Sequence, residues 1–343
     1  MNQTPSTFDL EKSVAHTVGE KLRIPLVSTG NPAGDKRFLQ GGYQKAGYGV
    51  AAGSAIDGSF TLEGNEGYFA PAGKKAFLSN VAAFRAFFER QEKKGKPFRL
   101  VLKTGIGGQH TPFQGIAGGF AVIDAPTVEI AGEYELGKNF ESFISAELKR
   151  LGAGWEQVAL IPSSKSGSTD ETMRIFEQIF HAMLRHEAKV AGQNDAGAQA
   201  LADSVFDSMH QANLNADGTE KPSSEFFKSF RLDRLPAAAQ PVFRKVLSRM
   251  FFETTDKPAE SRLSAFIRNS GLDQALGEDA PGFGAMFDNV GGRWTADLHM
   301  MTFLAYHKLN AEAYWQARHD EVVLVRDGRH AANRMGIGSS IRV

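Results

Sequence analysis

The feature that most limits what this chain can fold into is a repeated alternation of strand-like and helix-like segments between residues 77 and 184. Apolar residues recur at helical spacing in the helical segments, and short apolar runs bounded by turn residues mark the strands. The pattern predicts helices over 77–90, 140–151 and from Thr169 onward, and strands over 98–103, 127–130 and 157–161. Strands and helices that alternate at these lengths predict an α/β fold, a doubly wound parallel sheet flanked by helices.

The rest of the chain is less regular. Residues 191–224 are rich in polar residues, with one helix-like piece over 200–209, and are expected to form an insertion on the surface. After this insertion the apolar spacing predicts helices over 241–252, 260–269 and 298–307, with a short apolar run over 283–287.

Composition excludes several classes of partner. The 343 residues contain 39 lysines and arginines and 39 aspartates and glutamates, so no global field attracts nucleic acid or an anionic membrane. The absence of cysteine removes disulfides and thiolate chemistry and is compatible with the cytoplasm. We find no apolar run near the roughly 20 residues of a membrane span. A cytoplasmic protein with small-molecule partners is expected.

A hydroxyl-rich turn, Ser163-Ser164-Lys165-Ser166-Gly167-Ser168-Thr169, follows the strand predicted over 157–161 and precedes a helix. Helix N-terminal amides together with hydroxyl donors and one lysine suit a dianion such as phosphate. A serine-rich turn with an ordinary helix cap would give part of the same pattern. The density of hydroxyls favours a phosphate site.

Two glycine turns add to this signal. Gly105-Ile106-Gly107-Gly108 follows the strand over 98–103, and Val290-Gly291-Gly292-Arg293 precedes the helix over 298–307. Glycines let a ligand approach the backbone, and the Arg293 guanidinium suits oxyanions, although it would equally pair with a carboxylate. Ligands bind at the carboxyl ends of strands in open parallel sheets, where we expect these turns to converge.

No metal or other cofactor is expected. His181 and His186 lie five residues apart on one predicted helix, so they point in different directions and do not form the i, i+4 pair that binds a metal ion.

The three turns, in this order, resemble those of the glucose-6-phosphate isomerase family. The resemblance implies a sugar-isomerase-type sandwich over residues 76–318, preceded by a glycine-rich extension over 1–75 and followed by a divergent or truncated tail over 319–343. It also implies a glycolytic and gluconeogenic enzyme that interconverts glucose 6-phosphate and fructose 6-phosphate through an enediol.

The resemblance also assigns roles to residues. Arg293 corresponds to the arginine that stabilises the negative charge of the enediol intermediate, which is the catalytic role implied here. The residues implied in substrate binding are Gly108, Gln109, Ser164, Lys165, Ser166, Thr169 and Glu171. Of these, Ser164, Lys165, Ser166 and Thr169 correspond to ligands of the substrate phosphate, and the others to positions near the sugar.

This sequence departs from the family pattern in three respects. Gln109 stands where the family more usually has serine, and Gly167 stands where it has a bulkier residue. The family's second half supplies the proton-transferring glutamate, a ring-opening histidine and a C-terminal lysine, and no such segment is recognisable here. We expect an isomerase that lacks this half. A homodimer is expected as well. The alternatives are a non-catalytic sugar-phosphate-binding module and an inactive fragment.

Overall fold

The computed structural model describes residues 7–8, 26–27, 71–105, 127–131, 139–167, 169–286 and 296–326. The chain forms two compact units. The terminal unit comprises Met1–Leu78, Asn289–Trp294 and Asn310–Val343, and the sheet unit comprises Ser79–Asp288 and Thr295–Leu309. Most of the predicted 1–75 extension and of the 319–343 tail lies outside the described residues.

In the terminal unit, two short strands pair antiparallel, β1 (Thr7–Phe8) with β2 (Leu26–Val27). The first turns of helix α3 (Pro71–Lys93) pack against helix α12 (Ala311–Arg326) in the same unit. The Phe77 and Tyr314 rings stack with their centroids 6.0 Å apart, and Lys74 pairs with Glu312 at 2.7 Å.

The sheet unit contains the remainder of α3 and all the other elements. Its strands are β3 (Leu100–Thr104), β4 (Thr127–Ala131), β5 (Val158–Pro162), β6 (Phe251–Thr254) and β7 (Gly282–Ala285). Its α-helices are α5 (Phe140–Leu151), α6 (Asp170–Val190), α7 (Asp195–Gln211), α8 (Ala239–Leu247), α9 (Arg262–Arg268), α10 (Leu272–Leu276) and α11 (Ala296–Tyr306). Short 3₁₀ turns lie at Trp155–Gln157, Ser223–Glu225, Leu232–Arg234 and Gly277–Asp279.

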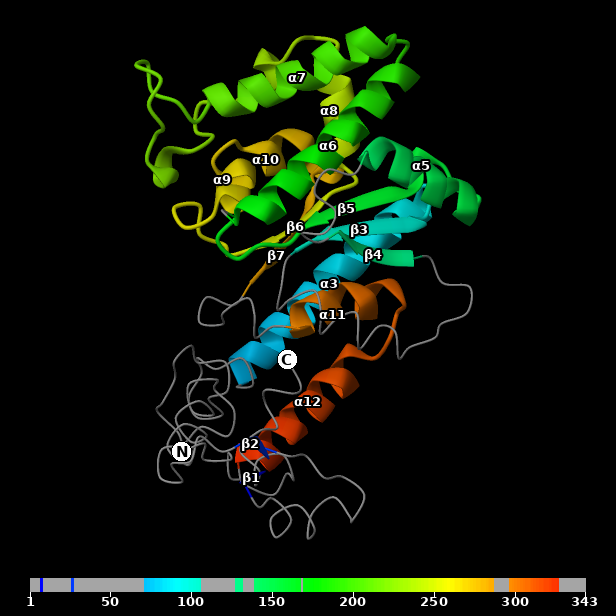
Figure 1. The fold of residues 1–343 in the computed structure, drawn as a ribbon, viewed down its shortest axis with the longest axis vertical. Coiled ribbons are helices and arrows are strands. Elements are labelled where there is room, and N and C mark those ends of the chain that lie inside the picture. Colours follow the sequence, from blue (N-terminus) through cyan, green and yellow to red (C-terminus); the bar gives the residue numbers. More distant parts are fainter. Residues whose placement is uncertain are drawn as a thin grey trace, which may run out of the picture. The chain divides into compact units, whose positions relative to one another are not determined.

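The strands of this unit run parallel in the spatial order β4-β3-β5-β6-β7 (Figure 1). β3 pairs with both β4 and β5, and β6 pairs with β7. Two isolated parallel bridges, Leu160 with Met250 and Ser163 with Glu253, join β5 to β6. The predicted α/β class with parallel strands is therefore confirmed.

Helices cover both faces of the strands. Successive side chains of a strand point to opposite faces, so apolar neighbours such as Phe251 and Phe252 are buried by different helices. On one face, Phe252 contacts Phe176 of α6 and Phe266 of α9. On the other face, Phe251 stacks on Phe84 of α3 with ring centroids 3.7 Å apart. Strands buried on both faces read as continuous apolar runs, which explains the composition of β3, β5 and β6.

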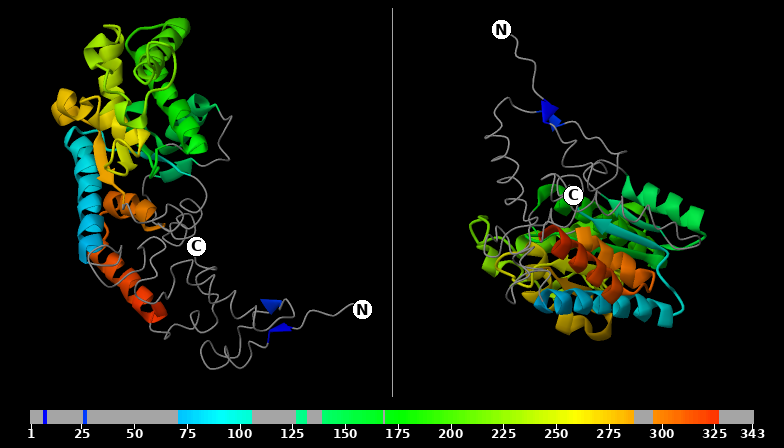
Figure 2. Two further views of the ribbon diagram at one scale, coloured as in Figure 1. Left: turned by 90° about the vertical axis from the view of Figure 1, so that its left-hand side faces the viewer. Right: turned by 90° about the horizontal axis from the view of Figure 1, so that it is seen from below.

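Helices α3 and α11 lie side by side on the Phe251 face, as the second orientation in Figure 2 also shows. The Phe88 ring of α3 meets the Tyr306 ring of α11 edge-on at 5.1 Å. The Tyr306 hydroxyl donates a hydrogen bond to the carbonyl of Phe98, just before β3. Burial raises the pKa of this hydroxyl, so it stays protonated and continues to donate at neutral pH.

On the opposite face, α6 is the central helix. Its Phe176 and Phe180 are buried in the core, and each fully buried side chain of this size contributes about 1.5–3 kcal/mol. Helix α7, within the polar segment 191–224, covers the outer side of α6 and buries Ala198, Leu201, Ala202 and Val205. The helix expected over 200–209 is thus part of a longer one that contributes to the core.

The predicted helix over 241–252 is wrong in its second half. Helix α8 ends at Leu247, and the residues that follow turn into strand β6. Val242, Phe243, Val246 and Leu247 follow the helical spacing, and Phe251 and Phe252 extend the apolar run without alternation. A strand buried on both faces gives no period of two, so the pattern did not separate it from the helix.

The Asn80 side chain of α3 pairs with strand β7. Its amide donates to the Ala285 carbonyl at 2.7 Å, and its carbonyl oxygen accepts from the Ala285 N–H at 3.2 Å. The amide therefore satisfies a donor and an acceptor of the strand backbone, as a neighbouring strand would.

Candidate functional site

The hydroxyl-rich turn (residues 163–169) lies at the carboxyl end of β5, and its residues 163–167 and 169 are described. Ser163 and Ser164 are buried, whereas Lys165 and Ser166 are half-buried. The turn closes on itself, because the Ser164 hydroxyl accepts a hydrogen bond from the Gly167 N–H at 3.1 Å. The structure therefore places Ser164, Lys165, Ser166 and Thr169 in one compact turn.

Thr169 is the residue that precedes helix α6. It has an extended backbone conformation, and its side chain makes no capping hydrogen bond to the helix. Its carbonyl accepts the first helical hydrogen bond, from Met173 at 2.9 Å. The alternative that the turn is an ordinary capped helix start therefore fails for Thr169, whose hydroxyl is not used by the helix. The first amides of α6 and this hydroxyl together suit an anion.

Strand β6 holds the turn from one side. The Ser164 N–H donates to the Glu253 carbonyl at 3.0 Å, and the Thr254 hydroxyl donates to the Lys165 carbonyl at 3.1 Å. The Thr254 hydroxyl also lies 2.5 Å from the Ser261 hydroxyl, at the start of α9. The turn is thus built onto the sheet and α9 rather than extending from them.

Gly167 is the point of closest contact between the turn and α9. Its φ of +57° is strained for any residue with a side chain, and a Cβ would lie 2.6 Å from the Ser261 hydroxyl and 2.7 Å from the Leu263 nitrogen. The start of α9 therefore occupies the space that a larger residue at this position would need.

The turn lies at the place where an open parallel sheet is expected to bind ligands. In the strand order found here, β3 and β5 are neighbours; the strand that follows β3 in the chain, β4, lies on one side of this pair, and the strand that follows β5, β6, lies on the other. Open parallel sheets are expected to bind ligands at the carboxyl ends of strands where the order reverses in this way. The Ser163 N–H donates to the carbonyl of Thr104, the last residue of β3, at 3.1 Å. Gly105, the first residue of the glycine turn, follows directly, so both turns start at this point.

Several predicted residues are not placed. Gly108, Gln109 and Arg293 lie outside the described residues. Glu171 lies in the first turn of α6, and only its backbone is described.

A buried polar cluster lies beneath the two turns, and sequence reasoning missed it. Lys103 of β3 pairs with Glu253 of β6 at 2.7 Å, and both side chains are almost inaccessible. The Ser163 hydroxyl donates to the same Glu253 oxygen at 2.5 Å, and the Lys103 ammonium donates to the Thr302 hydroxyl of α11 at 2.9 Å. The ammonium also lies over the Phe84 ring, 5.5 Å from its centroid.

Burial lowers the pKa of Lys103, and the attraction of the Glu253 carboxylate partly offsets this effect. A charged residue inside each of two apolar runs, Phe98 to Thr104 and Met250 to Thr254, was the sequence signal for this pair. It was not used, because residues 250–252 of the second run were assigned to a helix and Glu253 was left outside any predicted strand.

The histidines singled out in the sequence serve separate contacts. His181 pairs with Asp203 of α7 at 2.9 Å, whereas the His186 ring stacks on Trp155 with centroids 4.4 Å apart. Among the residues that the structure describes, no group of three or more acidic, histidine or cysteine side chains is placed to hold a metal ion.

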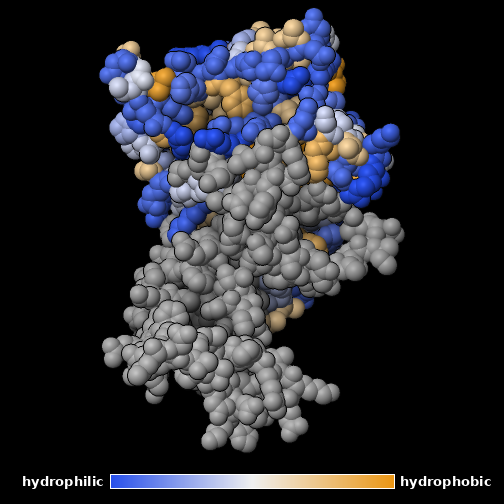
Figure 3. Space-filling model, viewed as in Figure 1, coloured by the Kyte–Doolittle hydropathy of each residue, from blue (hydrophilic) through white to orange (hydrophobic). Residues whose placement is uncertain are grey.

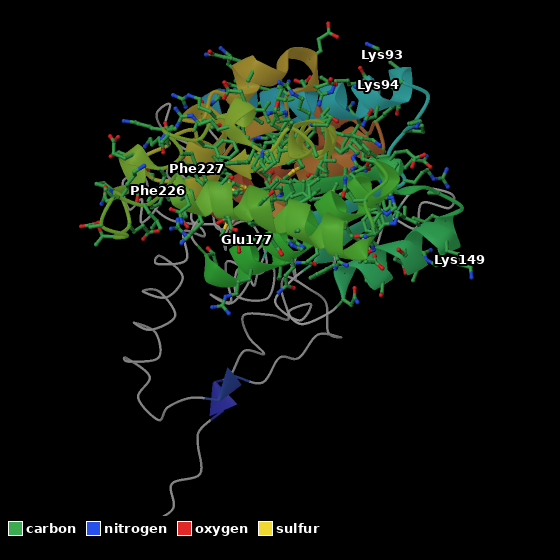
Figure 4. The ribbon with its side chains drawn as sticks, turned by 90° about the horizontal axis from the view of Figure 1, so that it is seen from above. Lys93, Lys94, Lys149, Glu177, Phe226 and Phe227 are labelled. Carbon is green, nitrogen blue, oxygen red and sulfur yellow. The ribbon has the colours of Figure 1, made fainter. Side chains whose placement is uncertain are left out.

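Two surface hollows lie beside α6 and α7, in the upper part of the surface that Figure 3 draws. One, of about 510 Å³, includes Glu141, Glu177 and Arg185 in its lining, and the other, of about 290 Å³, includes Met173, Phe206 and Phe266. Glu177, labelled in Figure 4, borders both. Neither lining includes a residue of the hydroxyl-rich turn, so these hollows are separate from the candidate site.

Within the described ranges, none of the helices has the length and apolar character needed to cross a membrane.

Comparison with known proteins gives no match by any of three routes: no family description matches the sequence, no curated protein matches it, and no solved structure matches the fold.

Proposed function

We propose that this chain binds a hexose phosphate at the hydroxyl-rich turn and interconverts glucose 6-phosphate and fructose 6-phosphate as a glucose-6-phosphate isomerase. The observation that carries the proposal is the position of the turn, at the carboxyl ends of β3 and β5, with the Thr169 hydroxyl unused by α6. The proposal includes the sugar-isomerase-type sandwich as the finer description of the fold.

The phosphate would be held by the hydroxyls of Ser164, Ser166 and Thr169, the Lys165 ammonium and the first amides of α6. Hydrogen bonds to a dianion are charge-assisted and roughly twice as strong as neutral ones, so such a site anchors the substrate by its phosphate. The anchored sugar would then extend toward the glycine turn, where Gly108 and Gln109 would line it and Glu171 would lie nearby.

Isomerisation moves a proton between C1 and C2 and develops negative charge on the enediol oxygens. A fixed guanidinium stabilises this charge more in the transition state than in the ground state, which is the role proposed for Arg293. The proposal includes a homodimer in the cytoplasm, a location with which the cysteine-free composition is compatible.

A coupled assay that converts fructose 6-phosphate to glucose 6-phosphate tests the activity. Lys165→Ala and Arg293→Ala should each abolish turnover, whereas Lys149→Ala, on the exposed end of α5, should leave it unchanged (Figure 4). Turnover no higher than in the Lys165→Ala and Arg293→Ala variants would exclude intrinsic isomerase activity.

One observation favours a second function, a non-catalytic sugar-phosphate-binding module. Glu253, the carboxylate that contacts the turn, has a side-chain exposure of 2% and is already bonded to Lys103 and Ser163. A base that removes a proton from the sugar must reach the substrate, and Glu253 in this position does not. Titration calorimetry separates the two functions: micromolar binding without turnover supports the module, and no binding of any hexose phosphate excludes both.

A further inference from the structure

We propose that Lys103 is a positioning residue that fixes the hydroxyl-rich turn, the carboxyl end of β3 and helix α11 relative to one another. This inference rests on the proposed function for its role in ligand binding, but its structural content can be tested without a ligand.

Burying Lys103 and Glu253 together has a cost in desolvation free energy. Lys103 has no exposed side-chain surface and Glu253 only 2%, so both charges are removed from water. An ion pair this deep in a protein recovers its desolvation cost only with good geometry and further hydrogen bonds, and an apolar pair of similar volume is often at least as stable. Stability alone is therefore a poor explanation for this pair.

The pair connects segments that are distant in sequence. Lys103 is the last residue but one of β3, which leads into the glycine turn, and its ammonium bonds both Glu253 and Thr302. The Glu253 side chain accepts from Ser163, and its main-chain carbonyl accepts from the Ser164 N–H. One ammonium group thus joins three segments that are distant in sequence.

Several of these segments adjoin, in sequence, the turns singled out in the sequence. β5 continues into the hydroxyl-rich turn, and α11 begins at Ala296, shortly after Arg293 in the sequence. Three of the segments connected through Lys103 and Glu253, namely β3, β5 and α11, therefore each adjoin in sequence one of the three turns that carry the proposed function. A binding site needs its groups held to within a fraction of an ångström, and the buried bonds that Lys103 and Ser163 make to one Glu253 oxygen, Oε2, supply such a constraint, whereas Oε1 has no hydrogen-bond partner among the described residues.

The chain offers a matched control at the other end of the strands. Arg249 and Glu187 form a second buried pair at 2.8 Å, with side-chain exposures of 3% each. Arg249 precedes β6, whereas Glu253 lies near the carboxyl end of the same strand. Loss of this pair should weaken the fold without loosening the turns.

The deciding experiment compares amide hydrogen exchange of two double variants, Lys103→Met/Glu253→Leu and Arg249→Met/Glu187→Leu. Both replace a buried pair by apolar residues of similar size, which preserves folding. We expect exchange of the Ser164 and Gly167 amides to become about tenfold faster in the first variant, the effect of losing about one hydrogen bond, and to change less than twofold in the second. Equal exchange in the two variants would overturn the proposal.

Ser163→Ala provides a second, milder variant, because it breaks only the hydrogen bond from the turn to the Glu253 side chain and leaves the one from the Ser164 N–H to the Glu253 carbonyl. It should raise exchange of the same two amides several-fold while the midpoint of thermal unfolding stays near that of the wild type. An unchanged exchange rate would also overturn the proposal.

Calorimetry with fructose 6-phosphate then separates the positioning role of Lys103 from the proposed function. Lys103→Met/Glu253→Leu should weaken binding about tenfold or more, since the ligand must then order the turn, and the Arg249 control should bind like the wild type. Equal affinity in the two variants counts against positioning. If the wild type itself binds no hexose phosphate, the proposed function fails, while the exchange comparison still decides the role of Lys103.

Discussion

Replacing Gly167 by alanine tests whether the hydroxyl-rich turn depends on its close contact with α9. Two costs add at this position. The left-handed conformation, with φ of +57°, costs a non-glycine residue roughly 1–2 kcal/mol. The added methyl group would lie 2.6 Å from the Ser261 hydroxyl and 2.7 Å from the Leu263 nitrogen, and overpacking of this kind costs about 1–3 kcal/mol. The free energy of unfolding should therefore fall by about 2–5 kcal/mol.

Gly152→Ala is the matched control for this change. Gly152 ends helix α5 with nearly the same backbone angle, φ +60°, but no atom lies within 4 Å of the Cβ position. It carries the conformational cost alone, so the difference between the two variants isolates the clash. Urea unfolding of both measures this difference, which we expect to be about 1–3 kcal/mol.

Equal losses in Gly167→Ala and Gly152→Ala would refute the reasoning, because they would show that the turn moves away from α9 without cost. A larger loss in Gly167→Ala should be accompanied by weaker binding of fructose 6-phosphate, since the Gly167 N–H closes the turn onto Ser164. Calorimetry on both variants checks this second effect.

The remaining predictions concern the sheet unit. Lys103→Met alone leaves the Glu253 carboxylate buried without its counter-charge and should lower the free energy of unfolding by about 3–5 kcal/mol in urea, a loss that adding Glu253→Leu should reverse. Burial lowers the pKa of His186 from its ordinary value near 6.5, so the unfolded chain binds the proton more readily than the folded chain. The free energy of unfolding should therefore fall as the pH drops through 6.5. Thermal unfolding between about pH 8 and about pH 5.5 should show a smaller fall for His186→Phe than for the wild type. Asn80→Ala should cost about 1–3 kcal/mol in urea, because both polar groups of Ala285 lose their partner, whereas Asn80→Asp should restore at most the bond to the N–H.

Where local signals agree with packing, the sequence predicted the fold closely. Helix α5 was expected over 140–151, and the structure gives the same bounds. Asn139 accepts from the Ser142 N–H at its start, and Gly152 takes the left-handed conformation at its end. Both ends are decided by single residues and their neighbours, which is why a sequence pattern was sufficient.

Strand β6 shows why other parts could not be predicted. Its residues are buried by contacts from both faces, Phe251 against Phe84 and Phe252 against Phe176, and these contacts join distant parts of the chain. No local period of two remains to distinguish it from the end of α8. The error also hid Glu253, because a carboxylate that directly follows a predicted helix over 241–252, rather than lying within a strand, gives no reason to pair it with Lys103.

The candidate site divides along the same line. The hydroxyls and glycine of the turn were recognisable, because they are adjacent in sequence and their chemistry is local. The hydrogen bond from the Thr254 hydroxyl to the Lys165 carbonyl and the contact of Gly167 with Ser261 depend on strand order, which a single sequence does not give. Sequence thus indicated the groups suited to an anion but not the framework that holds them.

The buried pair of Lys103 and Glu253 has a consequence for the history of the chain. A change at either position alone leaves an unpaired charge in the core, whereas a joint change to apolar residues does not. Substitutions at the two positions should therefore occur together in related proteins, and intermediates with only one change should be rare. If the pair also orders the turns, lineages that lost it should have lost ligand binding too, or should show a different polar bridge among the same three segments.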